Sequence, residues 1–252
     1  MAKLTEIVQW CDGMLSAGQF KDYCPNGLQV EGKAEVQQVV SSVTASLQAI
    51  EAALDLKADL LMVHHGYFWK GEPSPLTGLK GRRIKQLMQA DISLLAYHLP
   101  LDAHPTLGNN AALAELLGIE ITGALDPSER YPVGNVGVLP AALTPAAFSA
   151  LLTDKLGQAP IHIATDKSQI KTIGFCTGGA QDYLYKAAAQ GCDAYLSGEV
   201  SERTYHEARE YGVDYFAAGH HATERFGIQR LGEALAKNFN LAYEYIELHN
   251  PI

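Results

Sequence analysis

The feature that most constrains this chain is a short apolar run that ends in two adjacent histidines and a glycine. Residues 60–63 are apolar, and His64, His65 and Gly66 follow them directly. A run this short, apolar and partly β-branched predicts a buried strand, and ligands in open α/β sheets gather beyond the carboxyl ends of strands. Neighbouring side chains in a strand point to opposite faces. We therefore expect the pleat to end here, with Gly66 letting the backbone turn so that both imidazoles face one cavity.

Helical and strand-like apolar patterns alternate along the rest of the chain. This order predicts an α/β fold with mixed, largely parallel sheets. The expected strands are 28–30, 36–43, 59–63, 92–97, 133–139, 161–164, 170–176, 193–196, 213–218 and 241–248. The expected helices are 4–17, 46–56, 82–90, 109–117, 145–156, 181–190, 201–211 and one that ends at 237, with Thr5 and Thr144 as N-terminal caps.

The polar, turn-rich segment 126–132 predicts a domain boundary. We expect two interlinked α/β lobes. Residues 1–125 plus 192–252 form the metal-binding lobe, and residues 126–191 form a second, smaller lobe. No internal repeat is visible in the sequence.

Composition narrows the class of protein. With 252 residues, of which 47% are hydrophobic, the chain is large enough for one large or two modest folded domains. The net charge of −9 disfavours a broad nucleic-acid-binding face. The four cysteines form no Cys-x-x-Cys motif, and neither a signal peptide nor a membrane-spanning run is visible. We expect a cytoplasmic protein with reduced thiols and no membrane association.

Three of the expected strands are followed by residue types that bind metals. His98 and Asp102 are four residues apart, as are His220 and Glu224, and the second spacing puts both side chains on one face of a beginning helix. The candidate ligands are His64, His65, His98, Asp102, His220 and Glu224.

Six ligands exceed the roughly three that a catalytic zinc takes from a protein. The surplus predicts two divalent metal ions, zinc, iron or manganese, with a bridging carboxylate. Two ions about 3.5–4 Å apart can activate a water molecule and hold the reacting group. Taken singly, each residue has an ordinary alternative: Asp102 could form a turn, and Glu224 could favour a helix start.

Longer motifs resemble the dinuclear-metal family of GTP cyclohydrolase 1 type 2 and its YbgI-like bacterial members. They occur in the expected order over nearly the whole chain. These motifs are Pro25-Asn26-Gly27-Leu28-Gln29-Val30, His64-His65-Gly66-Tyr67-Phe68-Trp69-Lys70-Gly71, His98-Leu99-Pro100-Leu101-Asp102 and Gly219-His220-His221-Ala222-Thr223-Glu224, with Cys176-Thr177-Gly178-Gly179 and Ser197-Gly198-Glu199-Val200-Ser201 shared by the bacterial branch.

The resemblance implies a particular site and assembly. It implies metal ligands at His64, His65, Asp102, His220 and Glu224, with Glu224 bridging the two ions. His98 would then be a sixth ligand or a near-site residue. It also implies a homohexamer built as a trimer of dimers.

Three further residues are candidates for catalysis. His221 follows a candidate ligand on a beginning helix, where it would point about 100° away, so we expect it to face the substrate or to support a ligand. His104 is either a general acid or base or a solvated loop histidine. Glu199 either approaches the site, where it could fix a ligand, or is a loop carboxylate.

Two other segments allow a binding or a structural interpretation. Tyr67, Phe68 and Trp69 either stack on a planar base or pack a subunit contact. The Thr177-Gly178-Gly179 segment either binds phosphate through backbone amides or forms an ordinary tight turn, which we favour.

Together these features predict a dinuclear-metal-dependent hydrolase of a nucleotide-like substrate. If the family name holds, the reaction is ring opening of GTP at C8 with release of formate. The alternatives are a phosphoesterase or nucleotidase acting on damaged nucleotides, and a non-catalytic metal-bearing scaffold that binds protein or nucleic acid.

Overall fold

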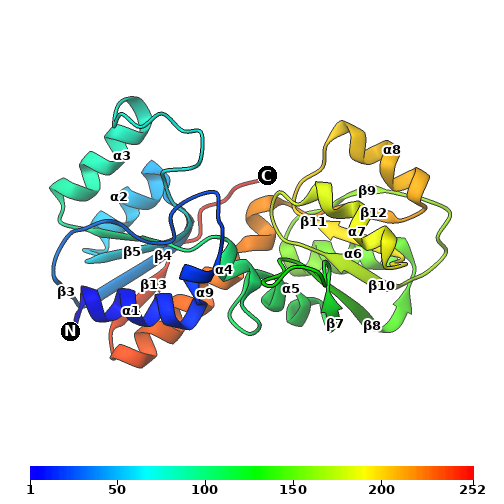
Figure 1. Ribbon diagram of the computed structural model, residues 1–252, viewed down its shortest axis with the longest axis horizontal. Helices are drawn as coiled ribbons and strands as arrows, with labels where there is room; N and C mark the ends of the chain where they lie inside the picture. Colours follow the sequence, from blue (N-terminus) through cyan, green and yellow to red (C-terminus); the bar gives the residue numbers. More distant parts are fainter. The chain divides into compact units, whose positions relative to one another are not determined.

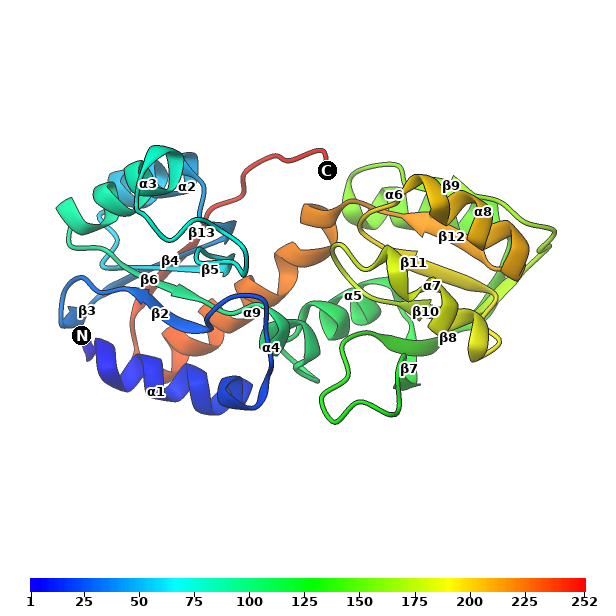
Figure 2. The same ribbon diagram turned by 45° about the horizontal axis from the view of Figure 1, so that its top comes forward.

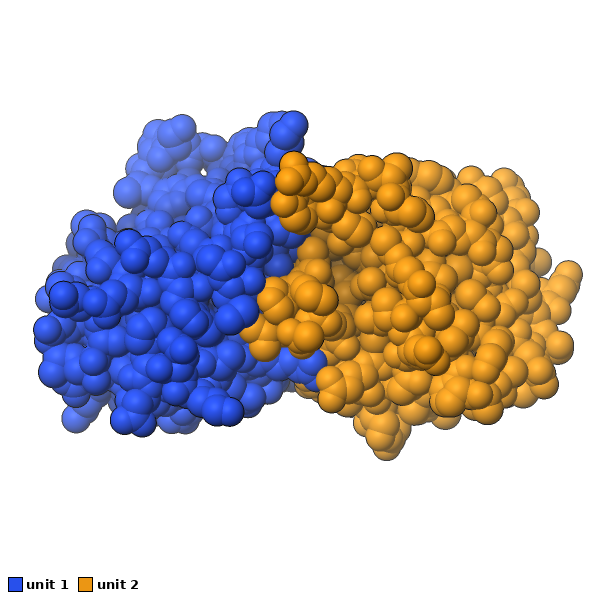
Figure 3. Space-filling view, turned by 60° about the horizontal axis from the view of Figure 1, so that its bottom comes forward, with its two compact units in different colours: residues 1–101, 227–249 blue, residues 102–226, 250–252 orange.

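A computed structural model describes residues 1–252 and divides the chain into two compact units (Figure 3). Unit 1 comprises Met1–Leu101 and Gly227–His249, and unit 2 comprises Asp102–Phe226 and Asn250–Ile252. The chain leaves unit 1 and later returns to it, so the units are interlinked as expected.

The unit boundaries differ from the predicted ones. Segment 192–226 belongs to unit 2, because its strands pair in parallel with strand β10 (Ile170–Phe175) of that unit. The turn-rich segment 126–132 joins two antiparallel strands of one sheet, β7 (Glu120–Ala124) and β8 (Asn135–Leu143). Its Pro and polar residues therefore mark a hairpin connection within unit 2 and do not separate two lobes.

Unit 1 is built on a five-stranded sheet of order β13-β4-β5-β6-β2, parallel except for β2 at its edge (Figure 1). The strands of unit 1, inside and outside this sheet, are β1 (Ala2–Lys3), β2 (Gly27–Val30), β3 (Glu35–Val36), β4 (Gln38–Thr44), β5 (Leu60–His65), β6 (Ser93–Ala96) and β13 (Ala242–Tyr245). Its helices are α1 (Leu4–Leu15), η1 (Ala17–Gln19), α2 (Leu47–Asp55) and α3 (Gly78–Gln89), with α4 (Leu99–Ala103) and α9 (His220–Phe239) each containing a unit boundary.

Helices cover both faces of this sheet. Helices α2 and α3 lie on one side, and α1 and α9 lie on the other (Figure 2). Leu61 and Val63 of β5 pack with Ile50 of α2 and Leu87 of α3 in one buried cluster. Because β5 is buried on both faces, its residues 60–63 are all apolar and do not alternate between apolar and polar.

Unit 2 is built on a six-stranded mixed sheet of order β7-β8-β10-β11-β12-β9. The elements not yet defined are α5 (Asn109–Leu117), α6 (Pro145–Leu156), β9 (Ile161–Ile163), η2 (Gln181–Tyr183), α7 (Leu184–Ala189), β11 (Ala194–Ser197), α8 (Glu202–Tyr211) and β12 (Asp214–Ala217). Among neighbouring strands, only the pairs β10–β11 and β11–β12 are parallel.

Alternate side chains of β11 and β12 pack in two separate hydrophobic cores, one on each face of the sheet. Leu196 and Phe216 pack with Phe148 of α6, whereas their neighbours Tyr195 and Tyr215 pack in a second cluster with α7 and α8. Unit 2 is therefore also a sheet covered by helices on both faces.

The central strands of the two units repeat one arrangement, although the sequence shows no repeat. In each unit three parallel strands lie side by side, β4-β5-β6 and β10-β11-β12, and an antiparallel strand, β2 or β9, pairs with the last of them. Asp59 precedes β5 and Asp193 precedes β11, and each carboxylate accepts hydrogen bonds from two backbone amides at the start of the neighbouring strand. The two arrangements share their strand topology but have different side chains, so comparison of the sequence with itself does not detect the repeat.

Local signals placed most helix ends well. Ser46 and Thr144 cap α2 and α6, each accepting a hydrogen bond from the amide three residues on. The predicted cap Thr5 is wrong, because α1 already begins at Leu4 after β1. Helix α3 begins at Gly78, earlier than the predicted residue 82. No helix has both the length and the apolar character needed to cross a bilayer.

Candidate metal centre

Three histidines of unit 1 gather where β5 and β6 end. His64 and His65 are the last residues of β5, and His98 follows β6. Their ring centroids lie 4.5 Å (His64 to His65), 5.2 Å (His64 to His98) and 5.9 Å (His65 to His98) apart. One nitrogen from each ring lies within 4.8 Å of the others. The prediction that adjacent His64 and His65 turn toward one place is confirmed.

Gly66 has a different function from the predicted one. Its φ is not positive, so it does not supply a left-handed turn. A Cβ at Gly66 would come within 2.2 Å of Gln29 Oε1 and 2.6 Å of Ala96 Cβ. The glycine is needed because the chain passes close to β2 and β6, and Gln29 then accepts a hydrogen bond from the Tyr67 amide at 2.7 Å.

The imidazoles of unit 1 are held through Nδ1. His64 Nδ1 lies 2.8 Å from the carbonyl oxygen of Tyr97. A carbonyl only accepts hydrogen bonds, so Nδ1 carries the proton and Nε2 is the nitrogen with a lone pair. His65 Nδ1 lies 3.1 Å from Thr44 Oγ1 at the end of β4. The proton on Nδ1 of His64 gives its Nε2 the lone pair that a metal ion could bind.

His98 is fixed by a carboxylate. Its Nδ1 donates to Asp22 Oδ1 at 2.7 Å, and its backbone amide donates to Asn26 Oδ1 at 2.8 Å. Burial alone would raise the pKa of Asp22, but the hydrogen bond and charge of His98 and hydrogen bonds from Asn26 and Tyr23 hold that pKa below its usual value. Asp22 is therefore an anion that orients His98, as carboxylates commonly do for histidine ligands.

In unit 2, His220 and Glu224 lie one turn apart at the start of α9, which follows β12 after two residues. His220 Nε2 lies 2.9 Å from Glu224 Oε2, which confirms the expected common helix face. His220 Nδ1 donates to Glu199 Oε1 at 2.7 Å. Burial lowers the pKa of His220, but hydrogen bonds and charges of Glu224 and Glu199 outweigh it and raise the pKa to about 9. Glu199, expected near the site, thus contacts His220 as a supporting carboxylate.

Asp102 lies at the end of α4 in a network of buried polar side chains. Its Oδ1 accepts hydrogen bonds from Asn109 Nδ2 at 2.8 Å and from Thr177 Oγ1 at 3.3 Å. One carboxylate oxygen of Asp102 lies within 4.8 Å of one of Glu224. Both residues are buried, with exposed fractions of 4% and 3%. Two buried carboxylates this close repel each other unless a cation compensates them.

The donor set suits metal ions. Imidazole nitrogens and carboxylate oxygens without thiolates are typical ligands of zinc, iron and manganese. A Cβ at Gly178 would lie 1.9 Å from Glu224 Oε1 and 3.1 Å from His220 Nε2, so a glycine is required beside these ligands. The buried His, Asp and Glu groups could therefore hold metal ions.

The two predicted proton carriers lie in different surroundings. His104 is half-buried, and its Nδ1 accepts hydrogen bonds from the amides of Leu107 at 3.0 Å and Thr106 at 3.3 Å. Its neutral form therefore carries the proton on Nε2. His221 is buried in the first turn of α9, and its amide donates to the backbone oxygen of Ile252.

The three aromatic residues after Gly66 are not equivalent. Tyr67 is buried and donates its hydroxyl hydrogen to the Ala45 carbonyl at 2.7 Å, and Phe68 packs against the core of unit 1. Only Trp69 faces the histidines, with its ring centroid 4.9 Å from that of His98 and 6.0 Å from that of His65.

Backbone amides in and next to the Thr177-Gly178-Gly179 segment donate hydrogen bonds within the protein. Three backbone amides of this turn donate to side chains of the protein: Thr177 to Asn110, Gly178 to Thr223 and Ala180 to Ser197. The favoured prediction of a tight turn agrees with this pattern.

Sequence reasoning missed the residues that support the ligands. Asp22, Thr44, Asn109 and Asn110 carry no motif of their own. The sequence offered one signal: Asp22 lies three residues before the motif that begins at Pro25, and the Asn109-Asn110 pair follows the motif that ends at Asp102.

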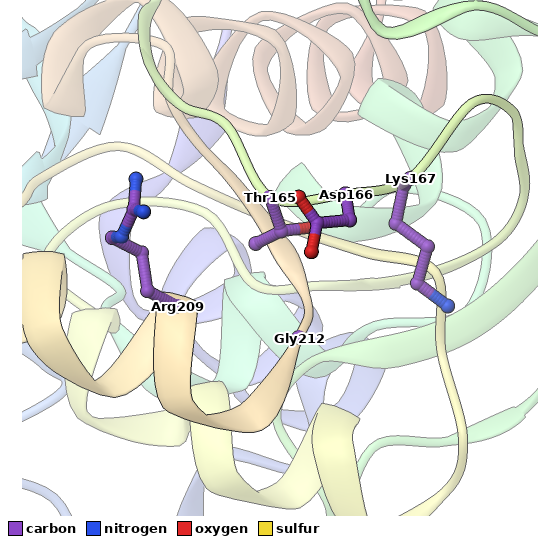
Figure 4. A pocket seen from close by; sticks show the side chains of 5 residues that line it. All are labelled: Thr165, Asp166, Lys167, Arg209 and Gly212. Carbon is purple, nitrogen blue, oxygen red and sulfur yellow. The ribbon is translucent and has the colours of Figure 1, made fainter.

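A separate cavity of about 240 Å³ lies elsewhere in unit 2 (Figure 4). It is lined by Thr165, Asp166, Lys167, Arg209 and Gly212. Lys167 is paired with Asp193 at 3.2 Å, and the Asp166 carboxylate lies between the two basic side chains. None of the candidate ligands lines this cavity.

Known proteins resemble the whole chain. "GTP cyclohydrolase 1 type 2 homolog" of Vibrio cholerae is 53% identical over 240 residues, covering 94% of this chain and 95% of that protein. The protein of the same name from Pseudomonas aeruginosa is 50% identical and covers 98% of each chain. A solved structure titled "protein ybgI, unknown function" superimposes with a TM-score of 0.96 at 44% identity over 100% of both chains. The family Duf34/NIF3 (NGG1p interacting factor 3) matches residues 2–251, and the chain therefore belongs to this family.

Proposed function

We propose that this protein is a metal-dependent hydrolase that acts on a nucleotide-like substrate. The proposed ligands of two divalent ions are His64, His65, His98, Asp102, His220 and Glu224. One observation carries the proposal: each of the four proposed histidine ligands has Nδ1 hydrogen-bonded to another group of the protein, which supports binding of metal through Nε2.

The chain's own residues orient the ligands and handle protons. When bound, a pair of divalent ions supplies a water-derived nucleophile near neutral pH and stabilises charge on the reacting group. Asp22 and Glu199 hold His98 and His220 in position. We assign His104 and His221 to proton shuttling, in which a neutral imidazole accepts a proton from the attacking water and the resulting imidazolium returns it to the leaving group.

The relatives' name directs the choice of substrate. We take GTP as the first candidate, because proteins that cover nearly all of this chain carry the name GTP cyclohydrolase 1 type 2 homolog. Addition of water at C8 would open the guanine ring to a formamide, and hydrolysis of that formamide would release formate. Trp69, beside His65 and His98, is the aromatic residue that we expect to contact the base.

The test is formate release from GTP by purified protein loaded with Zn²⁺, Mn²⁺ or Fe²⁺. Glu224→Gln should abolish turnover, whereas Glu233→Gln, an exposed position on the same helix, should not. Release of phosphate without formate would move the assignment to a phosphoesterase. Absence of any turnover by protein that holds both ions would contradict the hydrolase and leave a metal-bearing scaffold.

Two further proposals concern the setting of the protein. All four cysteines are free and buried, which supports a reducing, cytoplasmic location. The resemblance noted from the motifs supports a homohexamer built as a trimer of dimers. Light scattering should then report about six times the chain mass of 27.2 kDa, and a monomer would contradict this assembly.

A further inference from the structure

We propose that Asn26 and Gln29 are positioning residues that fix the two histidine-bearing strand ends of unit 1. Both belong to the motif 25–30, none of whose residues is a proposed ligand or proton carrier. The inference rests on the proposed function, because it takes the histidines of unit 1 as metal ligands.

Gln29 lies at an irregularity in the edge strand β2. Its neighbours Leu28 and Val30 pair with adjacent residues of β6, Leu95 and Leu94. A regular antiparallel ladder would place these partners two residues apart, so Gln29 is an extra residue in β2. Such a residue bends a strand and redirects a side chain, and it is frequent next to active sites. The side chain of Gln29 reaches past β6 to the chain that follows β5.

The side-chain amide of Gln29 binds both backbone groups of Tyr67. Its Oε1 accepts from the Tyr67 amide at 2.7 Å, and its Nε2 donates to the Tyr67 carbonyl oxygen at 3.1 Å. Nε2 also donates to the carbonyl oxygen of Pro25 at 2.8 Å. With its oxygen and its nitrogen both engaged, the amide keeps one orientation. Tyr67 is the second residue after His65, so Gln29 holds the chain just beyond the end of β5.

This contact requires the smallest residue at position 66. A Cβ on Gly66 would lie 2.2 Å from Gln29 Oε1, so a larger side chain would displace the amide. The same stretch carries Trp69, whose Nε1 donates to the Gly66 carbonyl oxygen at 3.1 Å. The ring of Trp69 faces His98, with 4.9 Å between the two ring centroids. Gln29 therefore also holds the segment that places this aromatic ring beside the histidines.

Asn26 holds the end of β6. Its Oδ1 accepts a hydrogen bond from the His98 amide at 2.8 Å, and its Nδ2 donates to Asp22 Oδ2 at 2.9 Å. Asp22 in turn accepts from His98 Nδ1 and from the Leu99 amide. Asn26 thus acts on His98 through its backbone and through the carboxylate that orients its ring. Because Asn26 and Gln29 are three residues apart, one short segment supports both strand ends.

The experiment compares Zn²⁺ binding by variants of the full chain, measured by calorimetric titration. Gln29→Met keeps the length of the side chain but removes its hydrogen bonds, so affinity should fall by about tenfold or more. Asn26→Leu removes the support of β6, and a similar loss is expected there if Gln29→Met fails to fold. Gln38→Met is the control and should bind as the unchanged protein does. Gln38 is also half-buried in this sheet, but it lies at the start of β4, at the opposite edge from the histidines.

The fluorescence of Trp69 gives a second readout in the metal-free protein. The chain has two tryptophans, so in a Trp10→Phe background Trp69 is the only one. In Gln29→Met the stretch beyond β5 loses its support, so the emission of Trp69 should shift and its quenching by acrylamide should increase. Neither should change in Gln38→Met.

The outcomes separate this inference from the proposed function. Unchanged Zn²⁺ affinity in a folded Gln29→Met or Asn26→Leu variant overturns it, as does an equal loss in Gln38→Met. Unchanged emission and quenching of Trp69 in Gln29→Met also overturn it, because the stretch would then keep its place without the amide. Unchanged protein that binds no metal overturns both proposals. Unchanged protein that binds two ions without hydrolysing any nucleotide removes the hydrolase but leaves the positioning of the histidines intact.

Discussion

At the scale of single residues, the candidate site includes carboxylates that orient the proposed ligands and are not themselves in the proposed ligand set. Asp22 and Glu199 come from different units, yet each accepts the Nδ1 proton of a candidate ligand at 2.7 Å. Such a carboxylate fixes the tautomer and raises the basicity of the opposite nitrogen. Neither residue belongs to the set of ligand types that follow the apolar strands.

Removing either carboxylate should weaken metal binding without removing a ligand. We expect Asp22→Asn and Glu199→Gln each to lower metal affinity by about 10–100-fold. Calorimetric titration with Zn²⁺ measures the change. Asp154→Asn, an exposed carboxylate on α6, is the control. Equal affinities in all four proteins would mean that these carboxylates do not act on the ligands.

Metal affinity should also depend on pH through His220. Its pKa in the metal-free protein is about 9, above the ordinary value of 6.5, and metals bind the neutral imidazole. Metal and proton therefore compete, so affinity should increase as pH rises from 7 to 9, by up to about tenfold per pH unit. Glu199→Gln lowers this pKa and should flatten the dependence. If the metal affinity of the unchanged protein does not vary between pH 7 and pH 9, the predicted competition between metal and proton at His220 is wrong.

At the scale of elements, two aspartates start equivalent strands. Asp193 accepts hydrogen bonds from the amides of Lys171 and Thr172, both at 3.0 Å, and pairs with Lys167. Asp59 does the same for Gln37 and Gln38 in unit 1. Each carboxylate satisfies backbone donors where a strand begins and no neighbouring strand provides an acceptor.

Asp193→Ala should lower the free energy of unfolding by about 1–3 kcal/mol, because two strand amides lose their acceptor. Burial raises the pKa of Asp193, but hydrogen bonds from Thr172, Lys171 and Lys167 lower it below the ordinary 3.8. The stability it contributes is thus present above about pH 4 and lost as pH falls further. Urea unfolding at pH 7 and pH 3 measures the difference. A deficit as large at pH 3 as at pH 7 would exclude the carboxylate as its cause.

At the scale of the whole molecule, the proposed ligands are spread along the chain from His64 to Glu224. His64, His65 and His98 belong to unit 1, and Asp102, His220 and Glu224 belong to unit 2. Two of them, His220 and Glu224, lie one turn apart at the start of α9, and the same helix continues into unit 1 (Figure 2). Metal that binds only the folded chain should therefore raise the stability of the folded protein.

Saturating metal should stabilise the chain measurably. At a free metal concentration one hundred times Kd, the gain is about 2.7 kcal/mol for one site. For a chain of this size that corresponds to a rise in Tm of roughly 5–10 °C. Scanning calorimetry with Zn²⁺ and with EDTA measures it. Glu224→Gln should gain much less, and an equal gain in this variant would place the stabilising ion elsewhere.

The sequence by itself determined the features that depend on residues close together in the chain. Apolar periodicity predicted the alternating α/β order, and the capping oxygen of Thr144 predicted the start of α6. The four-residue spacing of His220 and Glu224 was sufficient to place both on one helix face, because a helix has a fixed pitch. These features depend on neighbours within a few residues, which the sequence states directly.

Only the tertiary structure decided which distant residues meet. Thr44 contacts His65 because β4 pairs with β5, and Asp22 contacts His98 across 76 positions of the chain. Segment 192–226 joined unit 2 through the pairing of β10, β11 and β12. Strand order and side-chain contacts over such separations depend on packing of the whole core, which no local pattern encodes.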